Sequence, residues 1–183
     1  MNWWNKIEEV VYKRMRKQHA PLREYLLNFI DEKNVISILE VGCGLISQFK
    51  NTAPVYQAID INVQTDAIHE DFTKLSDSVV LGFKDKFDLL LANSVIEHCE
   101  FGYRDFIYTA AEINAKYTII GFFNGLNRKD DYFFYKTSHG GEYPWNKYSQ
   151  KKMEKFLKEI GIADRSEFIR LGRHDTILII KGI

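Results

Sequence analysis

The sequence has few of the residues that cross-link or interrupt a chain. Its 183 residues include two cysteines, Cys43 and Cys99, and three prolines. With only two cysteines no disulfide framework is implied, and the pattern fits a reducing compartment. Cys43 is expected to pack within a turn and Cys99 within a helix. Because the histidines are scattered at no metal-ligand spacing, no metal site is expected.

Long apolar runs and an excess of charge are also missing. No apolar segment approaches the roughly 20 residues that a membrane-spanning helix needs. Residues 1–9 carry acidic side chains where a secretory signal would be apolar. The 25 basic and 25 acidic side chains give a formal net charge of zero, which argues against a chain built mainly to coat nucleic acid. We therefore expect a cytoplasmic protein without a membrane span; the sequence leaves its oligomeric state open.

Apolar patterning predicts one α/β domain over residues 1–183. Helical spacing in residues 3–30, interrupted at Pro21, predicts an N-terminal helical cap over 1–33. In residues 35–183, short β-branched runs alternate with helical patterns, which is typical of a mostly parallel sheet with helices on both faces. The expected strands are 35–41, 55–61, 87–92, 117–123, 166–171 and 175–181. The last two have a connection short enough for an antiparallel hairpin.

A glycine-containing turn, LEVGCG at 39–44, follows the first expected strand. Glycines let the backbone approach a ligand, and a helix starting after the turn would offer free N–H groups. Asp60, within AIDI at 58–61, places a carboxylate at the end of the second strand, where it can accept both hydroxyls of a ribose. A dinucleotide site has a similar pattern, and so does a tight turn beside a solvated acid.

The order of the segments resembles the class I S-adenosylmethionine-dependent methyltransferases. The matching segments are ILEVGCG (38–44), AIDIN (58–62), HEDF (69–72), FDLLLANSVIEHC (87–99), KKMEKFLKEIGI (151–162) and TILIIKG (176–182). The resemblance covers residues 35–183, and its FDLxLxxxVxEH pattern is most similar to the small-molecule type. It implies a Rossmann-like, seven-stranded, mostly parallel sheet with a reversed last strand, and S-adenosylmethionine as cofactor.

The resemblance also implies a set of cofactor-binding residues. These are Glu40 at the methionine amino group, Gly42 and Gly44 beneath the cofactor, Asp60 at the ribose diol, Asp71 and the Phe72 backbone at the adenine, and Asn93 and Ser94 beside the sulfonium. The sequence departs from the family in two places. Ile46 stands where the family often has a third glycine, and the connection 61–70 is too short for the usual helix.

The resemblance places the acceptor site near His98, which is the candidate general base. Methyl transfer is an in-line displacement that depends mainly on alignment, and a base is needed only when the acceptor must lose a proton. The aromatic-rich segment 122–148 lies where the family builds its acceptor pocket, and His139, Tyr135 and Trp145 are its candidate substrate-binding residues. A structural histidine at a helix start and an ordinary core-covering loop are the alternatives.

The leading functional hypothesis is methyl transfer to an oxygen or nitrogen of a small-molecule acceptor. The segment after the expected strand 87–92 reads Ala92-Asn93-Ser94-Val95 and has no Asn/Asp-Pro-Pro-aromatic motif, and no Pro-Cys pair supplies a nucleophile, so two nucleic-acid methyltransferase classes are disfavoured. An RNA or protein methyltransferase and a non-catalytic cofactor-binding or scaffold protein remain as alternatives. Residues 3–30 and 122–148 are expected to cover the acceptor pocket.

Overall fold

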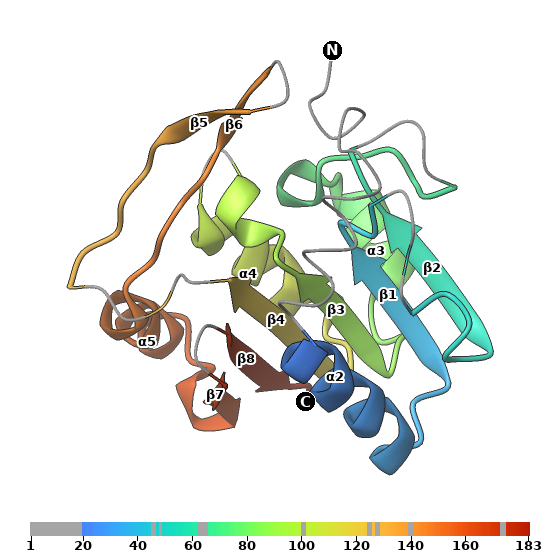
Figure 1. The fold of residues 1–183 in the computed structure, drawn as a ribbon. Coiled ribbons are helices and arrows are strands. Elements are labelled where there is room, and N and C mark those ends of the chain that lie inside the picture. The colour runs from blue at the N-terminus through green and yellow to red at the C-terminus, as the bar shows by residue number, and fades with distance from the viewer. Residues whose placement is uncertain are drawn as a thin grey trace.

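A computed structural model describes residues 20–44, 47, 49–61, 66–99, 102–123, 126, 129–138, 141–172 and 175–183. Its main sheet has six strands in the order β2-β1-β3-β4-β8-β7 (Figure 1). The strands are β1 (Ser37–Val41), β2 (Val55–Ile59), β3 (Leu89–Asn93), β4 (Tyr117–Phe123), β7 (Ser166–Leu171) and β8 (Asp175–Lys181). The first four are parallel, whereas β8 is antiparallel to β4 and β7. This confirms the predicted Rossmann-like class and its reversed last strand.

The described sheet has six strands instead of the predicted seven. Beyond β2, the described residues form only an isolated parallel bridge between Ile59 and Ile68. Its hydrogen bonds run from Asp60 N to Ile68 O and from Ile68 N to Ala58 O. Two full parallel strands need a crossover of a dozen or more residues. The connection 61–70 is shorter than that, and this explains why the pairing stops at a bridge.

In the described residues, four α-helices flank the sheet: α2 (Ala20–Glu32), α3 (Asp77–Phe83), α4 (Tyr103–Ile113) and α5 (Gln150–Glu159). Pro21 lies in the first turn of α2, where the missing N–H has no intrahelical partner to lose. Leu22 and Leu26 of α2 pack with Ile119 of β4 on one face of the sheet. Residues 1–19, the rest of the predicted cap, lie outside the described residues, so the predicted cover over the pocket is not tested there.

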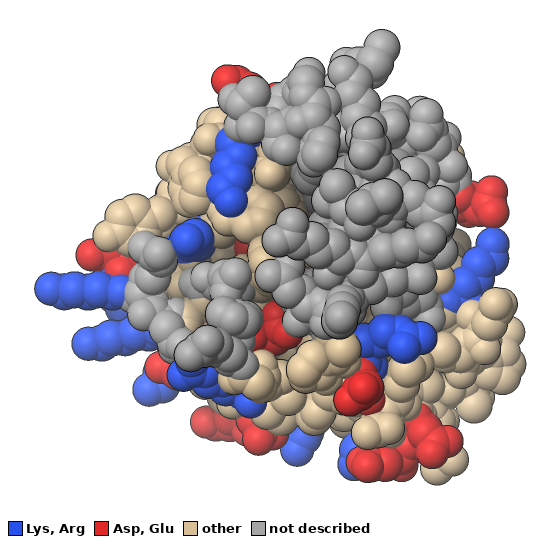
Figure 2. All heavy atoms as spheres, viewed as in Figure 1, with Lys and Arg blue, Asp and Glu red and all other residues tan. Residues whose placement is uncertain are grey.

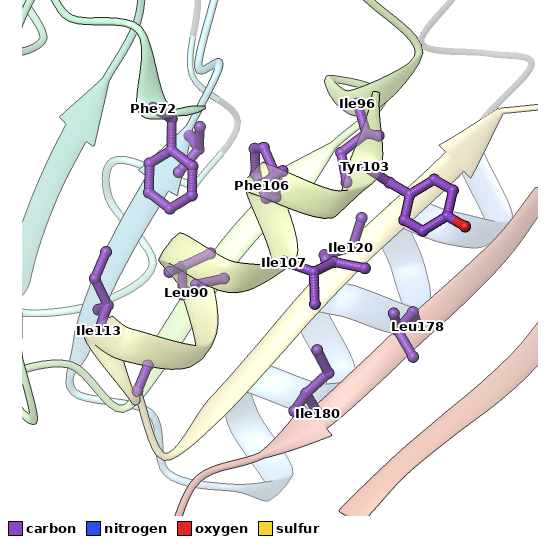
Figure 3. Packing of buried hydrophobic residues seen from close by; sticks show 14 of the residues in the cluster. Phe72, Leu90, Ile96, Tyr103, Phe106, Ile107, Ile113, Ile120, Leu178 and Ile180 are labelled. Atoms are coloured by element: carbon purple, nitrogen blue, oxygen red, sulfur yellow. The ribbon is translucent and has the colours of Figure 1, made fainter. Parts of the chain in front are cut away.

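The other face of the sheet carries the larger core, under α3, α4 and α5. Figure 3 shows Phe106 and Ile107 of α4 pointing toward the sheet residues Ile120 and Leu178. All four side chains are fully buried. Alternation along each parallel strand sends neighbouring residues to opposite cores, which is why the strands read as continuous apolar runs.

The segment between β1 and β2 differs from the expectation. The sequence predicted a helix after the glycine turn, but the described residues of 42–54 form only bends and turns. Phe49 nevertheless anchors this segment, since its side chain is buried in the core beneath α2. In the described residues the glycine turn therefore leads into a loop and not into the start of a helix.

A separate hairpin projects beyond the sheet, at the upper left of Figure 1. Its strands are β5 (Tyr135–Ser138) and β6 (Gly141–Pro144), and it falls inside the aromatic segment 122–148, where no strand was predicted. A bridge between Tyr132 and Lys147 extends the pairing toward the body of the protein. Among the described residues, no helix is both long and apolar enough to cross a membrane.

Candidate functional site

The candidate site lies at the edge of the sheet where β1, β2, β3 and β4 end. Parallel α/β sheets bind ligands outside the carboxyl ends of their strands, where neighbouring connections diverge. Here β1 lies between β2 and β3 in the sheet. The connection after β1 leads to β2 on one side of β1, and the connection after β2 leads back to β3 on the other side. Gly42, Asp60 and Ser94 each follow directly after one of these strands. The fold therefore brings three of the predicted residues to one edge.

Asp60 holds the glycine turn in place. Its Oδ2 accepts a hydrogen bond of 2.8 Å from the Gly44 N–H, and the Cys43 Sγ lies 3.8 Å from the same oxygen. The Gly42 N–H donates to the Ile59 carbonyl at 2.8 Å. Burial, followed by the charges of Asp60 and Glu40, raises the pKa of the Cys43 thiol to about 12. Cys43 is thus a protonated packing residue, as predicted, and no nucleophile at neutral pH.

The two glycines of the turn have different surroundings. Gly42 has a φ of +70°, and a Cβ there would lie 2.5 Å from the Val95 Cγ2, inside any real contact distance. Gly44 has a φ of +63°, but among the described residues a Cβ there would meet nothing within 4 Å. Gly42 is therefore required by packing against Val95, whereas no described atom fills the space beside Gly44, where a ligand could lie.

Glu40 is a buried carboxyl beside this space. Its Oε2 accepts hydrogen bonds of 2.5 Å from both the Ser47 hydroxyl and the Tyr56 hydroxyl. Burial raises the pKa of Glu40, and the nearby Asp60 charge raises it further, although the two hydrogen bonds oppose the shift. Two carboxyls this close favour a positively charged group between them. Sequence reasoning missed Ser47 and Tyr56, because neither belongs to a recognisable motif.

Asp71 and Phe72 lie at the start of a short 3-10 helix, Phe72–Lys74. Asp71 caps this helix by accepting hydrogen bonds from the Thr73 N–H at 3.0 Å and the Thr73 hydroxyl at 2.6 Å. Burial opposes ionisation, but these bonds and Lys74 outweigh it and lower the pKa of Asp71. The Phe72 side chain packs on Phe106 in the core, with ring centroids 4.5 Å apart. Because the side chain is taken up by the core, its backbone is the part left for the predicted contact with the adenine.

Asn93 and Ser94 form the end of β3. Ser94 has a φ of +58°, an unusual backbone for a serine, and its N–H donates to the Gly121 carbonyl of β4 at 2.9 Å. A Cβ at Gly121 would lie 2.8 Å from the Asn93 Oδ1, so the missing side chain makes room for Asn93 over β4. Backbone strain of this kind concentrates at functional sites.

His98 is surrounded by aromatic rings from the base of the hairpin. Its ring centroid lies 5.3 Å from that of Trp145 and 5.8 Å from that of Tyr143. Trp145 also contacts Phe123 at the end of β4, with centroids 5.8 Å apart. We call His98, Phe123, Tyr143 and Trp145 the ring cluster. The cluster brings together two predicted site residues, His98 and Trp145, that are far apart in the sequence.

The protonation state of His98 follows from its contacts. Burial lowers the pKa of His98 to about 4, and the positive charge of Lys136 acts in the same direction. Its Nδ1 lies 3.0 Å from the Pro144 carbonyl oxygen, which can only accept, so Nδ1 carries the proton. Nε2 of the neutral ring therefore carries the lone pair that a general base needs.

Glu97 is a buried carboxyl that sequence reasoning did not single out. Its Oε1 accepts from the Phe123 N–H and its backbone carbonyl accepts from the Asn146 N–H at 2.7 Å, whereas its Oε2 is buried with no hydrogen-bond partner. Burial raises the pKa of Glu97 to about 7. In the sequence, Glu97 belongs to the quoted FDLxLxxxVxEH pattern, directly before His98, but it was given no role of its own.

Of the two remaining predicted substrate residues, only Tyr135 lies within the described part of the chain, and it is not a member of the ring cluster. Tyr135 is 61% exposed. Tyr135 pairs with Pro144 in the hairpin register, and alternation places it on the face opposite Lys136 and Tyr143. His139 lies outside the described residues. Among the described residues, no group of three or more His, Cys, Asp or Glu side chains could hold a metal ion.

Solved structures share this fold at low sequence identity. A methyltransferase of Clostridium acetobutylicum ATCC 824, described as dependent on S-adenosylmethionine, is similar with a TM-score of 0.62 and 12% identity, covering 98% of this chain and 99% of that one. The 1,6-didemethyltoxoflavin-N1-methyltransferase of Burkholderia thailandensis, with bound 1,6-didemethyltoxoflavin and S-adenosylhomocysteine, has a TM-score of 0.61 and 10% identity over 93% of this chain and 81% of that one. Magnesium protoporphyrin IX methyltransferase of Synechocystis PCC 6803, with bound S-adenosylmethionine, has a TM-score of 0.61 and 12% identity over 97% of this chain and 86% of that one. No protein-family model matches the sequence, and no curated protein matches it significantly.

Proposed function

We propose that the protein is an S-adenosylmethionine-dependent methyltransferase acting on an oxygen or nitrogen of a small-molecule acceptor. The observation that carries this proposal is the hydrogen bond from the Gly44 N–H to Asp60. This bond joins the glycine turn after β1 to the acid after β2, next to the open space above Gly44. The shared fold with structures that contain S-adenosylmethionine or S-adenosylhomocysteine supports it.

The residues present fit this cofactor. Gly44 leaves room for a ligand against the backbone. Both hydrogen bonds to Glu40 fall on its Oε2, so Oε1 is the atom that would accept from the methionine amino group. Asp60 would accept from the ribose, and Asp71 with the Phe72 backbone would hold the adenine. Asn93 and Ser94 would lie beside the sulfonium, and the acidic pair Glu40 and Asp60 suits a ligand that carries positive charge.

The chain would contribute alignment, exclusion of water and a base. When bound, the cofactor supplies a methyl group on a positively charged sulfur, which leaves with the electron pair of the broken C–S bond. The ring cluster would hold the acceptor and keep water from it, since rings provide large apolar area with few rotatable bonds. Nε2 of His98 would take the proton from the acceptor atom. The hydrogen bond from Nδ1 to Pro144 would keep this tautomer in place during the transfer.

Two observations favour a small acceptor over a polymer: the ring cluster, and the acceptors named for two of the similar solved structures. Tyr143 is buried, and its contacts with His98 and Trp145 make a compact group. Two of the similar structures are named as methyltransferases of small molecules, 1,6-didemethyltoxoflavin and magnesium protoporphyrin IX. One observation favours RNA instead: three aromatic side chains on the hairpin segment, Tyr132, Phe133 and Tyr135, are half or more exposed.

Calorimetric titration of the full chain with three ligands, together with an RNA-retention assay, distinguishes a methyltransferase from a dinucleotide-binding protein, a scaffold and an RNA methyltransferase. We expect S-adenosylhomocysteine and S-adenosylmethionine to bind, and NAD⁺, the ligand of a dinucleotide fold, not to bind. Binding of NAD⁺ alone would replace the proposal with a dinucleotide site, and binding of none of the three would favour a scaffold role. Retention of RNA that falls steeply with added salt, together with cofactor binding, would favour an RNA methyltransferase.

A further inference from the structure

Lys136 of the hairpin lies beside the ring cluster, and Lys147 lies near enough to Lys136 for its charge to act on it. The mechanism above uses neither lysine. The Lys136 Nζ lies 3.5 Å from the centroid of the Trp145 ring, well within cation–π distance. Hairpin register places Lys136 opposite Tyr143, and alternation from Tyr143 through Trp145 places Lys147 on the same face. The ring contact between Tyr143 and Trp145 confirms that these residues share a face.

We propose that the acceptor is an anionic aromatic molecule whose carboxylate or phosphate binds Lys136 and Lys147 while its apolar part contacts the ring cluster. This inference rests on the proposed function and specifies the acceptor class for that site. The proposed cofactor site does not depend on this inference, because Lys136 and Lys147 lie on the hairpin segment and not at the strand ends where the predicted cofactor residues lie.

The first argument is the unbalanced positive charge. In the part of the chain that the structure describes, neither Lys136 nor Lys147 forms an ion pair. The neighbouring acids are already engaged: Asp130 lies 3.1 Å from the Lys152 Nζ, and Asp131 accepts from the Ser149 N–H at 2.7 Å. Glu142, one residue from Tyr143 in β6, points to the opposite face of the hairpin.

The second argument is that the two ammonium groups repel each other. Desolvation lowers the pKa of Lys136, and the charge of Lys147 lowers it further. A bound anion would remove this repulsion, because it interacts favourably with both charges at once. On the face drawn in Figure 2, Lys and Arg side chains gather on the side where the hairpin and α5 lie, with acidic groups between them.

The third argument is the distance from these charges to the base. Lys136 contacts Trp145, and Trp145 contacts His98 with ring centroids 5.3 Å apart. The charge of Lys136 also acts on His98 directly. An anionic group held by the lysines would therefore leave the rest of a small ring within reach of the His98 Nε2. Such a molecule needs a hydroxyl or amine on the far side of its ring from the anionic group.

The test uses matched ligands and matched variants of the full chain saturated with S-adenosylhomocysteine. The ligand pairs are 4-hydroxybenzoate with its methyl ester, and 4-hydroxyphenyl phosphate with hydroquinone; each pair differs in the anionic group. The variants are Lys136→Met/Lys147→Met and, as the control, Lys151→Met/Lys158→Met, which removes two exposed lysines of α5. Calorimetry measures the affinity of each ligand and of S-adenosylhomocysteine.

We expect at least one anion to bind about tenfold or more tightly than its neutral partner, an advantage that Lys136→Met/Lys147→Met removes and the control keeps. Preference for the carboxylate or for the phosphate identifies the anionic group. The inference is overturned if no anion binds, if the neutral partners bind as tightly, or if both double variants weaken binding equally. It is also overturned if a short single-stranded RNA binds through Lys136 and Lys147 while the anions do not. Binding of S-adenosylhomocysteine should be the same in all three proteins, so its absence in the unaltered chain identifies a failure of the proposed function itself.

Discussion

The Nδ1 atom of His98 lies 3.0 Å from the carbonyl oxygen of Pro144, a residue 46 positions further along the chain. This contact joins the short helix after β3 to the base of the hairpin. Two further bonds repeat the connection, from the Asn146 N–H to the Glu97 carbonyl and from the Tyr148 hydroxyl to the Ile96 carbonyl. The hairpin that carries Trp145 is thus anchored to the segment that carries the candidate base.

Replacing His98 should separate its two roles. In His98→Asn the side-chain amide can still donate to Pro144, but no atom replaces the lone pair of Nε2. We expect turnover to fall by about 10²–10⁴-fold, the usual contribution of a general base, with little loss of stability. His98→Ala should lose both turnover and anchoring. Single-turnover rates and thermal melts measure the two effects, and unchanged turnover in His98→Asn would show that no base is needed.

The pH dependence of turnover should reflect a His98 that stays neutral. Its folded pKa of about 4 lies below the ordinary value of 6.5, so the unfolded chain binds more protons between these values. The contribution of His98 to stability is therefore complete above about pH 6.5 and is lost as pH falls toward about 4. We expect His98 to stay unprotonated across neutral pH, so the turnover rate should be constant there and decline only below about pH 5. A midpoint near pH 6.5 in a rate profile would contradict this environment.

The contribution of Glu97 to stability should depend on pH in the opposite direction to that of His98. Its folded pKa of about 7 lies above its ordinary value of 4.5, so the folded state binds more protons between these values and stability falls as pH rises through them. Relative to the unaltered chain, Glu97→Gln should gain up to about 3 kcal/mol between pH 4.5 and pH 8. Urea unfolding at several pH values measures the difference. Glu154→Gln, an exposed change on α5, is the control, and equal slopes for the two variants would refute the assignment.

The sequence predicted the fold better than it predicted the acceptor site. The strands and the final hairpin follow from local patterns, because parallel strands buried on both faces read as apolar runs. In the described residues, pairing beyond β2 stops at the bridge between Ile59 and Ile68. The short connection 61–70 predicted that the usual helix is lacking, but the sequence analysis still expected the seventh strand. The ring cluster depends on contacts such as His98 with Trp145, which no periodicity encodes. Glu97 became visible only when burial left its Oε2 without a partner.

The two glycines of the turn should respond differently to the same substitution. Gly42→Ala adds a methyl group 2.5 Å from the Val95 Cγ2 in a left-handed backbone, so a loss of about 2–4 kcal/mol is expected. Gly44→Ala meets nothing within 4 Å and should lose only about 1 kcal/mol, but its methyl group would occupy the proposed cofactor space. Denaturant unfolding and S-adenosylhomocysteine titration measure the two effects. Val95→Ala should partly rescue Gly42→Ala, and equal stability losses at both glycines would contradict the packing described.

The most direct measurement compares the affinity for S-adenosylhomocysteine of Asp60→Ala and Asp66→Ala by calorimetry. Asp60 is buried and bonds to the Gly44 N–H, whereas the Asp66 side chain is 93% exposed and pairs only loosely with Lys50, at 3.3 Å. We expect Asp60→Ala to weaken binding by about tenfold or more, corresponding to about 1.4 kcal/mol, and Asp66→Ala to leave it nearly unchanged. Equal affinities for the two variants would contradict a cofactor site built on the glycine turn and Asp60.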